Sequence, residues 1–169
     1  HISITLAIVL YLSLPIEIPM FDSLKTQVAA ILQNESQTPN TQLQAVCEIL
    51  RNRVEHYDWV GFYFHNGDKE ELILGPYAGD ATDHTVIPFG KGICGQVALS
   101  NSNFIVPDVN AQDNYLSCSI HVKAEIVVPI FVNGKNIGQI DIDSRTLNPF
   151  TSKDEQFLEW VCQAVAKIL

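Results

Sequence analysis

Apolar residues recur at every third or fourth position in three segments, a spacing typical of helices that bury one side. We expect the first helix to open at Asp22 and the second to be capped by Asn40 or Thr41. Thr151 should cap the third, with Asp154 as its capping-box partner. The apolar sides comprise Leu24, Val28, Ile31 and Leu32, then Leu43, Val46, Cys47, Leu50 and Val54, and finally Phe157, Leu158, Val161, Cys162, Val165 and Ile168. The pattern predicts amphipathic helices near both ends of the chain.

The middle of the chain is rich in β-branched and aromatic residues broken by turn residues, which favours strands. The predicted strands are residues 58–64, 71–74, 84–88, 104–107, 125–132 and 136–143. Asn133 and Gly134 form a strong hairpin signal between the last two strands. Residues 75–83 and 108–119 are expected to be loops, and Gly92 leads into a short helix that carries Cys94.

This order of elements predicts an α+β fold with an antiparallel sheet of about six strands. The amphipathic helices near both ends must cover one face of the sheet, because each has an apolar side to bury. The polar, loop-rich middle must then lie over the opposite face. A cup between sheet and loops is a suitable place for a small-molecule site.

The length of 169 residues and the 47% hydrophobic content fit one globular domain, which we assign to residues 20–169. Residues 1–19 are an apolar extension that is too short to span a bilayer and lacks the basic start of a secretory signal. We expect the native protein to start at Met20; a truncated signal or anchor, or an extra packing element, are the alternatives. A net charge of −9 without a basic cluster argues against nucleic acid or membrane as a partner. We expect a cytoplasmic protein.

The four cysteines divide into two kinds. Cys47 and Cys162 lie on apolar helical stripes, where a thiol packs as an inert core residue, whereas Cys94 and Cys118 lie in Gly- or Ser-rich settings that suit a reactive thiol. The spacing does not resemble a disulfide scaffold, and the absence of CxxC and HExxH motifs argues against a zinc site. Cys94 and Cys118 are therefore the candidate chemical groups.

Carboxylates occupy positions in the predicted sheet that normally pack a core. Asp141 and Asp143 alternate with isoleucines, so both should face the cup. The two-residue turn predicts that Glu125 lies beside Ile142 and diagonal to both aspartates. Keeping three neighbouring carboxylates ionised in a partly closed cup costs free energy, so at least one should have a raised pKa. Alternatively, the aspartates cap backbone or pair with Arg145.

Two aromatic residues share a face of the first predicted strand. Trp59 and Tyr63 are four residues apart and could form a wall of the cup, although aromatic residues on strands are usually core. Beside carboxylates, such a wall suits an ammonium-bearing ligand through charge and cation–π attraction.

Several segments together resemble the GAF-domain enzymes that reduce free methionine-(R)-sulfoxide. The matching segments are residues 59–63 (WVGFY), 74–76 (LGP), 87–95 (IPFGKGICG), 124–129 (AEIVVP) and 137–144 (IGQIDIDS). The likeness runs from about Phe21 to the C-terminus, and it implies a GAF-like fold. It also implies a requirement for neither organic cofactor nor metal, and it is compatible with a homodimer.

The resemblance implies roles for the residues already singled out. Cys118 would attack the sulfoxide and become a sulfenic acid, and Cys94 would condense with it to a disulfide that a thioredoxin-type reductant resets. Glu125, Asp141 and Asp143 would hold the substrate amine and help protonate the departing oxygen, while Trp59 and Tyr63 would enclose the thioether end.

The chain departs from the family pattern at one position. Members commonly carry a third cysteine ten residues before the equivalent of Cys94, and here that position is His84. Cys94 is then the expected resolving thiol, unless an external thiol acts directly; His84 either lowers the pKa of Cys118 or is simply exposed. The departure keeps a second function open, that of a non-catalytic GAF module that binds and senses a small metabolite.

Overall fold

An antiparallel six-stranded sheet forms the centre of the computed structural model, which describes residues 18–117 and 119–169. The helices are α2 (Met20–Leu32), α3 (Pro39–Arg53), α4 (Gly92–Ser100) and α5 (Ser152–Ala166), with a short 3-10 helix, η1 (Val109–Ala111). The strands are β1 (Trp59–His65), β2 (Glu71–Ala78), β3 (Val86–Pro88), β4 (Phe104–Val106), β5 (Ala124–Val132) and β6 (Lys135–Ser144). The strand order is β3-β2-β1-β6-β5-β4, so the first and last hairpins meet at the β1–β6 pair in the middle of the sheet.

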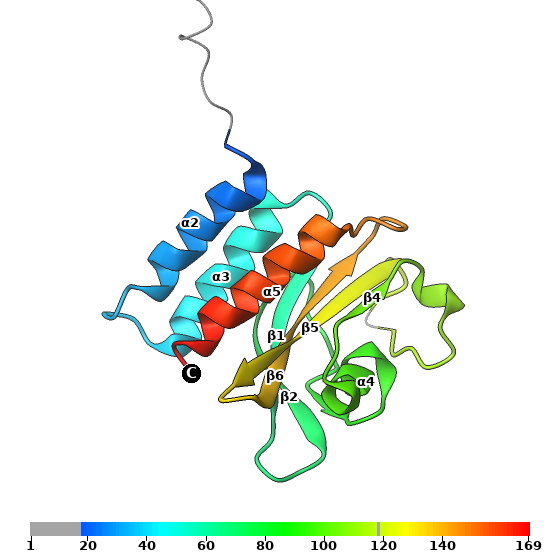
Figure 1. Ribbon diagram of the computed structural model, residues 1–169. Helices are drawn as coiled ribbons and strands as arrows, with labels where there is room; N and C mark the ends of the chain where they lie inside the picture. The colour runs from blue at the N-terminus through cyan, green and yellow to red at the C-terminus, as the bar shows by residue number, and fades with distance from the viewer. Residues whose placement is uncertain (1–17, 118) are drawn as a thin grey trace, which may run out of the picture.

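The two faces of the sheet are covered differently. Helices α2, α3 and α5 lie together over one face, and α4 lies over the other (Figure 1). Alternate residues of the central strands, such as Val60, Ile126 and Ile142, are buried against the three helices. The predicted α+β architecture is confirmed. Within the described residues, no helix is both long and apolar enough to cross a membrane.

Several predicted element boundaries are wrong. Helix α2 begins at Met20 rather than Asp22, which lies in its first turn where a carboxylate favours the helix dipole. Helix α3 is capped by Thr38, whose side chain accepts the Thr41 backbone N–H, and Pro39 occupies the first helical position. The Thr151–Asp154 capping box of α5 is confirmed.

Strand β2 extends to Ala78, whereas residues 75–83 were expected to form a loop. Its second half continues to pair with β1, as in Gly61 opposite Tyr77, and a register shift between Gly61 and Tyr63 accommodates an extra β2 residue. The shift falls at Gly75 and Pro76. Proline is tolerated at such a bulge because it has no N–H to give to the ladder.

The β5–β6 hairpin also contains a bulge. Asn133 and Gly134 form the predicted turn, with φ values of 51° and 76°. Phe131 pairs with Asn136 but Ile130 pairs with Gly138, so Ile137 is the extra residue. From there on the register is shifted by one, which corrects the prediction that Glu125 lies beside Ile142: it lies opposite Asp143.

Candidate active site

The sheet face opposite the three helices presents polar side chains in register. Trp59 of β1, Asp143 of β6 and Glu125 of β5 form one cross-strand row. In the next row, Asp141 lies between Gly61 and Val127. Residues two apart on a strand share a face, so Asp141 and Asp143 point to the same side of the sheet. Glu125 points to that side as well, because it is the direct cross-strand partner of Asp143. The predicted grouping of these three carboxylates is confirmed.

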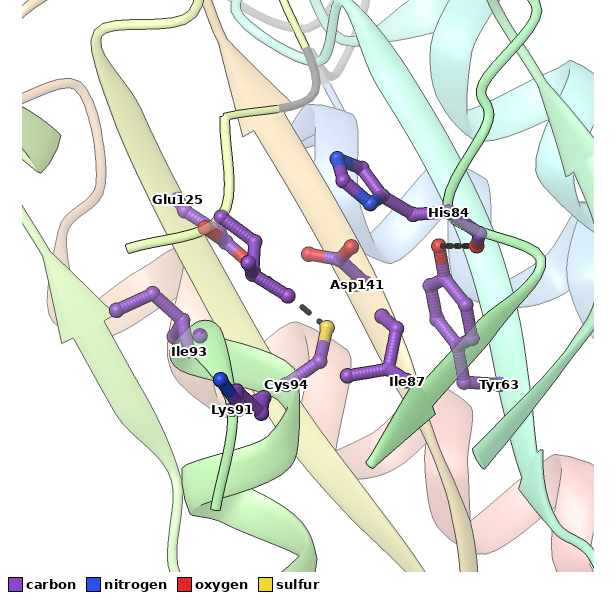
Figure 2. A pocket seen from close by; sticks show the side chains of 10 residues that line it. Tyr63, His84, Ile87, Lys91, Ile93, Cys94, Glu125 and Asp141 are labelled. Atoms are coloured by element: carbon purple, nitrogen blue, oxygen red, sulfur yellow. Dashed lines mark hydrogen bonds between the residues drawn. The ribbon is translucent and has the colours of Figure 1, made fainter. Parts of the chain in front are cut away.

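Helix α4 brings Cys94 onto this face. The thiol is 4% exposed, and its Sγ donates to Oε1 of Glu125 at 3.8 Å. The buried amide of Gln139 donates to the Cys94 backbone oxygen at 3.2 Å, which fixes the first turn of α4 to β6. Gly95 allows the close approach, since a Cβ there would lie 2.6 Å from the Pro88 oxygen. Figure 2 shows the Cys94, Glu125 and Asp141 side chains converging.

The three carboxyl groups are buried, with no positive partner in the part of the chain that the structure describes. Glu125, Asp141 and Asp143 are 5%, 2% and 2% exposed, and Oδ1 of each aspartate makes no hydrogen bond with a described residue. None of the ion pairs in the described part of the chain involves them. Arg145 binds Asp80 instead, at 2.9 Å, so the alternative in which it neutralises the strand aspartates is wrong.

Burial changes the acidity of the whole cluster. Loss of solvation, followed by repulsion from Asp141, raises the pKa of Glu125 and of Asp143 well above the ordinary range. Burial also raises the pKa of Asp141, to about 6. The pKa of the Cys94 thiol rises well above its usual value, through burial and then through Asp141 and Glu125. The cluster therefore holds protons at a pH where exposed carboxyl groups have lost them, as predicted.

The aromatic residues form one side of the same face. The Trp59 indole stacks on Tyr77 with ring centroids 5.3 Å apart, and its Nε1 donates to the Asp80 backbone oxygen at 3.1 Å. The Tyr63 hydroxyl donates to the His84 backbone oxygen at 2.9 Å. Both rings are largely buried and share the predicted face. Gly61 leaves the space over which Trp59 lies, since a Cβ at Gly61 would come within 2.2 Å of the indole.

A small cavity of about 10 Å³ lies at the centre of these groups, room for a single water-sized particle. Its walls are Tyr63, His84, Ile87, Lys91, Gly92, Ile93, Cys94, Leu116, Glu125 and Asp141. Sequence reasoning missed Ile87, Lys91, Ile93 and Leu116, because none has a spacing signal that separates it from ordinary loop or core residues. A second cavity of about 30 Å³ adjoins Trp59 and Asp143.

His84 is half-buried at this cavity rather than simply exposed. Its Nε2 lies 3.0 Å from the backbone oxygen of Ser117, and Leu116 contributes to the cavity wall. Cys118 itself lies outside the described residues, so its predicted role stays a prediction.

The other two cysteines are core residues, as predicted. Cys47 and Cys162 are 0% and 3% exposed, within the core under the three helices. Burial raises the pKa of both thiols, which keeps them protonated and unreactive. They are suitable controls for experiments on Cys94 and Cys118.

Comparison with known proteins places this geometry in a family. The family model for the GAF domain matches residues 38–169. The chain belongs to the GAF domain family. Among GAF relatives, the free methionine-R-sulfoxide reductase of Saccharomyces cerevisiae is 42% identical over 65% of this chain, which spans 62% of that protein's length. The free methionine-R-sulfoxide reductase of Escherichia coli is 35% identical, with 72% of each chain covered.

Solved GAF structures agree with the sequence relatives. The crystal structure of free methionine-R-sulfoxide reductase from Neisseria meningitidis, in complex with its substrate, superposes with a TM-score of 0.82 at 31% identity. The match covers 88% of this chain and 87% of that one. This GAF protein is therefore related to free methionine-R-sulfoxide reductases, as its sequence motifs indicated.

Proposed function

We propose that the protein reduces free methionine-(R)-sulfoxide to methionine. The observation that carries the proposal is the cluster of Glu125, Asp141 and Asp143, three buried carboxyl groups with no cationic partner among the described residues. A free amino acid supplies the missing charge through its ammonium group, and Trp59 adds cation–π attraction from the same face. The relatedness to free methionine-R-sulfoxide reductases supports the choice of substrate.

In the proposed reaction the thiolate of Cys118 attacks the sulfoxide sulfur. Oxygen passes to the cysteine, so methionine sulfoxide and a thiol become methionine and a sulfenic acid. The transferred oxygen needs a proton as it leaves the substrate, and Glu125 is a suitable donor because burial raises its pKa. The two residues before Cys118 support a thiol acting at this cavity. Leu116 is part of the cavity wall, and the Ser117 backbone oxygen lies beside His84 Nε2.

We propose Cys94 as the resolving thiol. Its Sγ lies at the same cavity, 3.8 Å from Glu125 Oε1. Condensation of the Cys118 sulfenic acid with the Cys94 thiol forms a disulfide and releases water; a thioredoxin-type dithiol then reduces the disulfide and is itself oxidised. Because the pKa of Cys94 is raised, this thiol is protonated in the resting protein, and a neighbouring carboxylate would accept its proton during condensation.

The test is an assay of free methionine-(R)-sulfoxide reduction with a thioredoxin system, in which consumption of the reductant is measured. We expect turnover by the wild type and by Cys162→Ala, and no turnover by Cys118→Ala. The S-epimer and peptide-bound sulfoxide serve as comparison substrates. Tight binding of the sulfoxide without turnover by the wild type would reject the enzyme and support the sensing function instead.

A further inference from the structure

Three residues of the cavity combine the ligand types that a divalent transition metal prefers. Cys94, Glu125 and Asp141 are all buried, and each offers one ligand atom within 4.8 Å of the other two. The Sγ of Cys94 and Oε1 of Glu125 are 3.8 Å apart. Thiolate and carboxylate ligands together suit borderline-soft Zn²⁺. The absence of zinc motifs in the sequence does not bear on this site, because the three residues come from α4, β5 and β6.

We propose that Cys94, Glu125 and Asp141 form a binding site for a single Zn²⁺ ion, which closes the cavity to other ligands. Around a tetrahedral zinc with bonds of about 2.1 Å to oxygen and 2.3 Å to sulfur, the ligand atoms lie about 3.4–3.6 Å apart. The separation of Sγ and Oε1 is already close to this value. Small side-chain rotations bring the Asp141 oxygen to the same distance, and one position remains open for water.

The unpaired oxygen of Asp141 is independent support for a ligand. Oδ1 has no hydrogen-bond partner within residues 18–117 and 119–169 although the residue is only 2% exposed, and the carboxyl group points into the cavity beside Cys94 (Figure 2). A buried polar atom left without a partner costs free energy, which a bound cation recovers. The cavity of about 10 Å³ has room for a single ion once the ligand side chains have rotated toward it.

Binding of Zn²⁺ adds positive charge to the carboxyl cluster and releases protons from the ligands. Zn²⁺ displaces the proton of the Cys94 thiol, so the thiol and the ion become a zinc thiolate and a released proton. Any proton shared by Glu125 and Asp141 leaves with it. Binding must therefore weaken as the pH falls, and each ion bound releases at least one proton.

The metal site does not depend on the proposed function, but the two share residues. If the protein is a reductase, Zn²⁺ occupies the carboxylates proposed to hold the substrate and blocks the thiol proposed to resolve the sulfenic acid. The ion would then be a competitive inhibitor that a chelator reverses.

The experiment titrates Zn²⁺ into the reduced, metal-free full chain in competition with a chromophoric chelator. We expect one site, and a loss of affinity of at least about 100-fold in Cys94→Ser, since even partners outside the coordination sphere are worth 10–100-fold. Asp141→Asn should weaken binding by at least about tenfold. Cys162→Ala is the matched control, a buried thiol outside the cavity, and should bind as the wild type does. Circular dichroism checks that each variant is folded.

Cd²⁺ provides a second readout, because a cadmium thiolate absorbs in the ultraviolet. The band should be present in the wild type, Cys162→Ala and Cys118→Ala, and absent in Cys94→Ser. Absence of a one-to-one site, unchanged affinity in Cys94→Ser, or loss of binding in Cys118→Ala would each overturn the proposal. Zinc binding by a protein that reduces no sulfoxide would keep the metal site and reject the proposed function; turnover without zinc binding would do the reverse.

Discussion

Glu125 and Asp143 are direct cross-strand neighbours on strands β5 and β6. The bulge at Ile137 makes them so, because the register beyond it is shifted by one residue. Side chains alternate between the faces of a strand, so without this shift Glu125 would pair with Ile142 and face the helices. A single extra residue near the turn therefore completes a carboxylate cluster at the far end of the hairpin.

Glu125→Gln should reduce kcat/KM for methionine sulfoxide by roughly 10–150-fold. The substitution keeps the shape of the side chain but removes both a charge and a proton donor, and a hydrogen bond to a charged group is worth about 1.5–3 kcal/mol. Steady-state kinetics measures the change. Glu70→Gln alters an exposed glutamate and should leave the kinetics unchanged; equal losses in both variants would argue against a specific role for Glu125.

Cys94→Ala should complete a first turnover but recycle slowly. Without a neighbouring thiol the sulfenic acid must react with an external one, which costs on the order of tenfold or more in rate because an intramolecular partner is pre-positioned. A sulfenic-acid-specific reagent should label this variant more strongly than the wild type after one equivalent of substrate. Normal recycling by thioredoxin would reject Cys94 as the resolving thiol.

Gly61→Ala should displace Trp59 from the sheet face that carries the three carboxyl groups. The new Cβ would lie 2.2 Å from the indole and 3.0 Å from the Cβ of Tyr77, so the ring must move. We expect KM to rise by about tenfold or more, since small misplacements of a binding group are costly. In a Trp160→Phe background, fluorescence reports on Trp59 alone, because the chain has two tryptophans.

The matched control for this substitution is Gly67→Ala. Its Cβ would meet nothing within 4 Å, and its φ of +57° predicts only a backbone cost of about 1 kcal/mol. Stability should fall slightly, while Trp59 fluorescence and KM stay the same. A shift of Trp59 fluorescence in both variants would show that loss of stability, rather than contact with the indole, causes the effect.

Asp141→Asn should stabilise the protein at neutral pH. Burial raises the Asp141 pKa from 3.8 to about 6, so between these values the folded state holds a proton that the unfolded state has lost. Stability from this group is thus greatest at low pH and declines as the pH rises through about 4 to 6. The amide removes a cost of about 1–3 kcal/mol at pH 7. Thermal melts should show an increase of about 2–4 °C for each kcal/mol.

The exposed Asp113→Asn is a suitable comparison and should leave the melting temperature unchanged. For Asp141→Asn, the advantage over the wild type should shrink as the pH is lowered to about 4, where the unfolded aspartate also gains its proton. An advantage that does not vary with pH would assign the effect to packing rather than ionisation.

Asp154→Asn should act in the opposite direction. Burial disfavours the Asp154 carboxylate, but hydrogen bonds from His56, the Thr151 backbone and Tyr57 outweigh it and lower the pKa. Such a group stabilises the fold above its unfolded pKa and loses that contribution as the pH falls through the folded value. The variant should lose roughly 2–4 kcal/mol at pH 7, measured by urea unfolding, and the difference should narrow below about pH 4.

The sequence predicts the elements of this fold better than it predicts their register. Periodicity identifies the helices and the sheet because the core residues repeat at the spacing of each element, as the buried Val46 and Ile142 illustrate. The Ile137 bulge leaves no such mark, because the facing strand β5 is apolar at every position from 126 to 132 and its sequence therefore fits either register. The partner of Glu125 could therefore not be predicted from the turn alone.

The residues of the candidate site can be predicted from the sequence, but their burial cannot. Alternation places Asp141 and Asp143 on one face, and the structure agrees. The Gly-rich setting of Cys94 suggested an accessible thiol, yet α4 buries it against β5 and β6. That burial depends on close approaches such as Gly95 to Pro88, which are contacts between segments and have no local sequence signal.

Alternate residues of strand β6 lie on opposite faces of the sheet and have different roles. Ile140 and Ile142 pack under the helices, while Asp141 and Asp143 lie on the opposite face, each at one of the two cavities. In a saturation-mutagenesis scan, adjacent codons should therefore give contrasting phenotypes: low abundance with normal chemistry per folded molecule at the isoleucines, and normal or higher abundance with impaired chemistry at the aspartates. Substitutions at the aspartates can therefore change which ligand the site binds while the core isoleucines one position away stay the same.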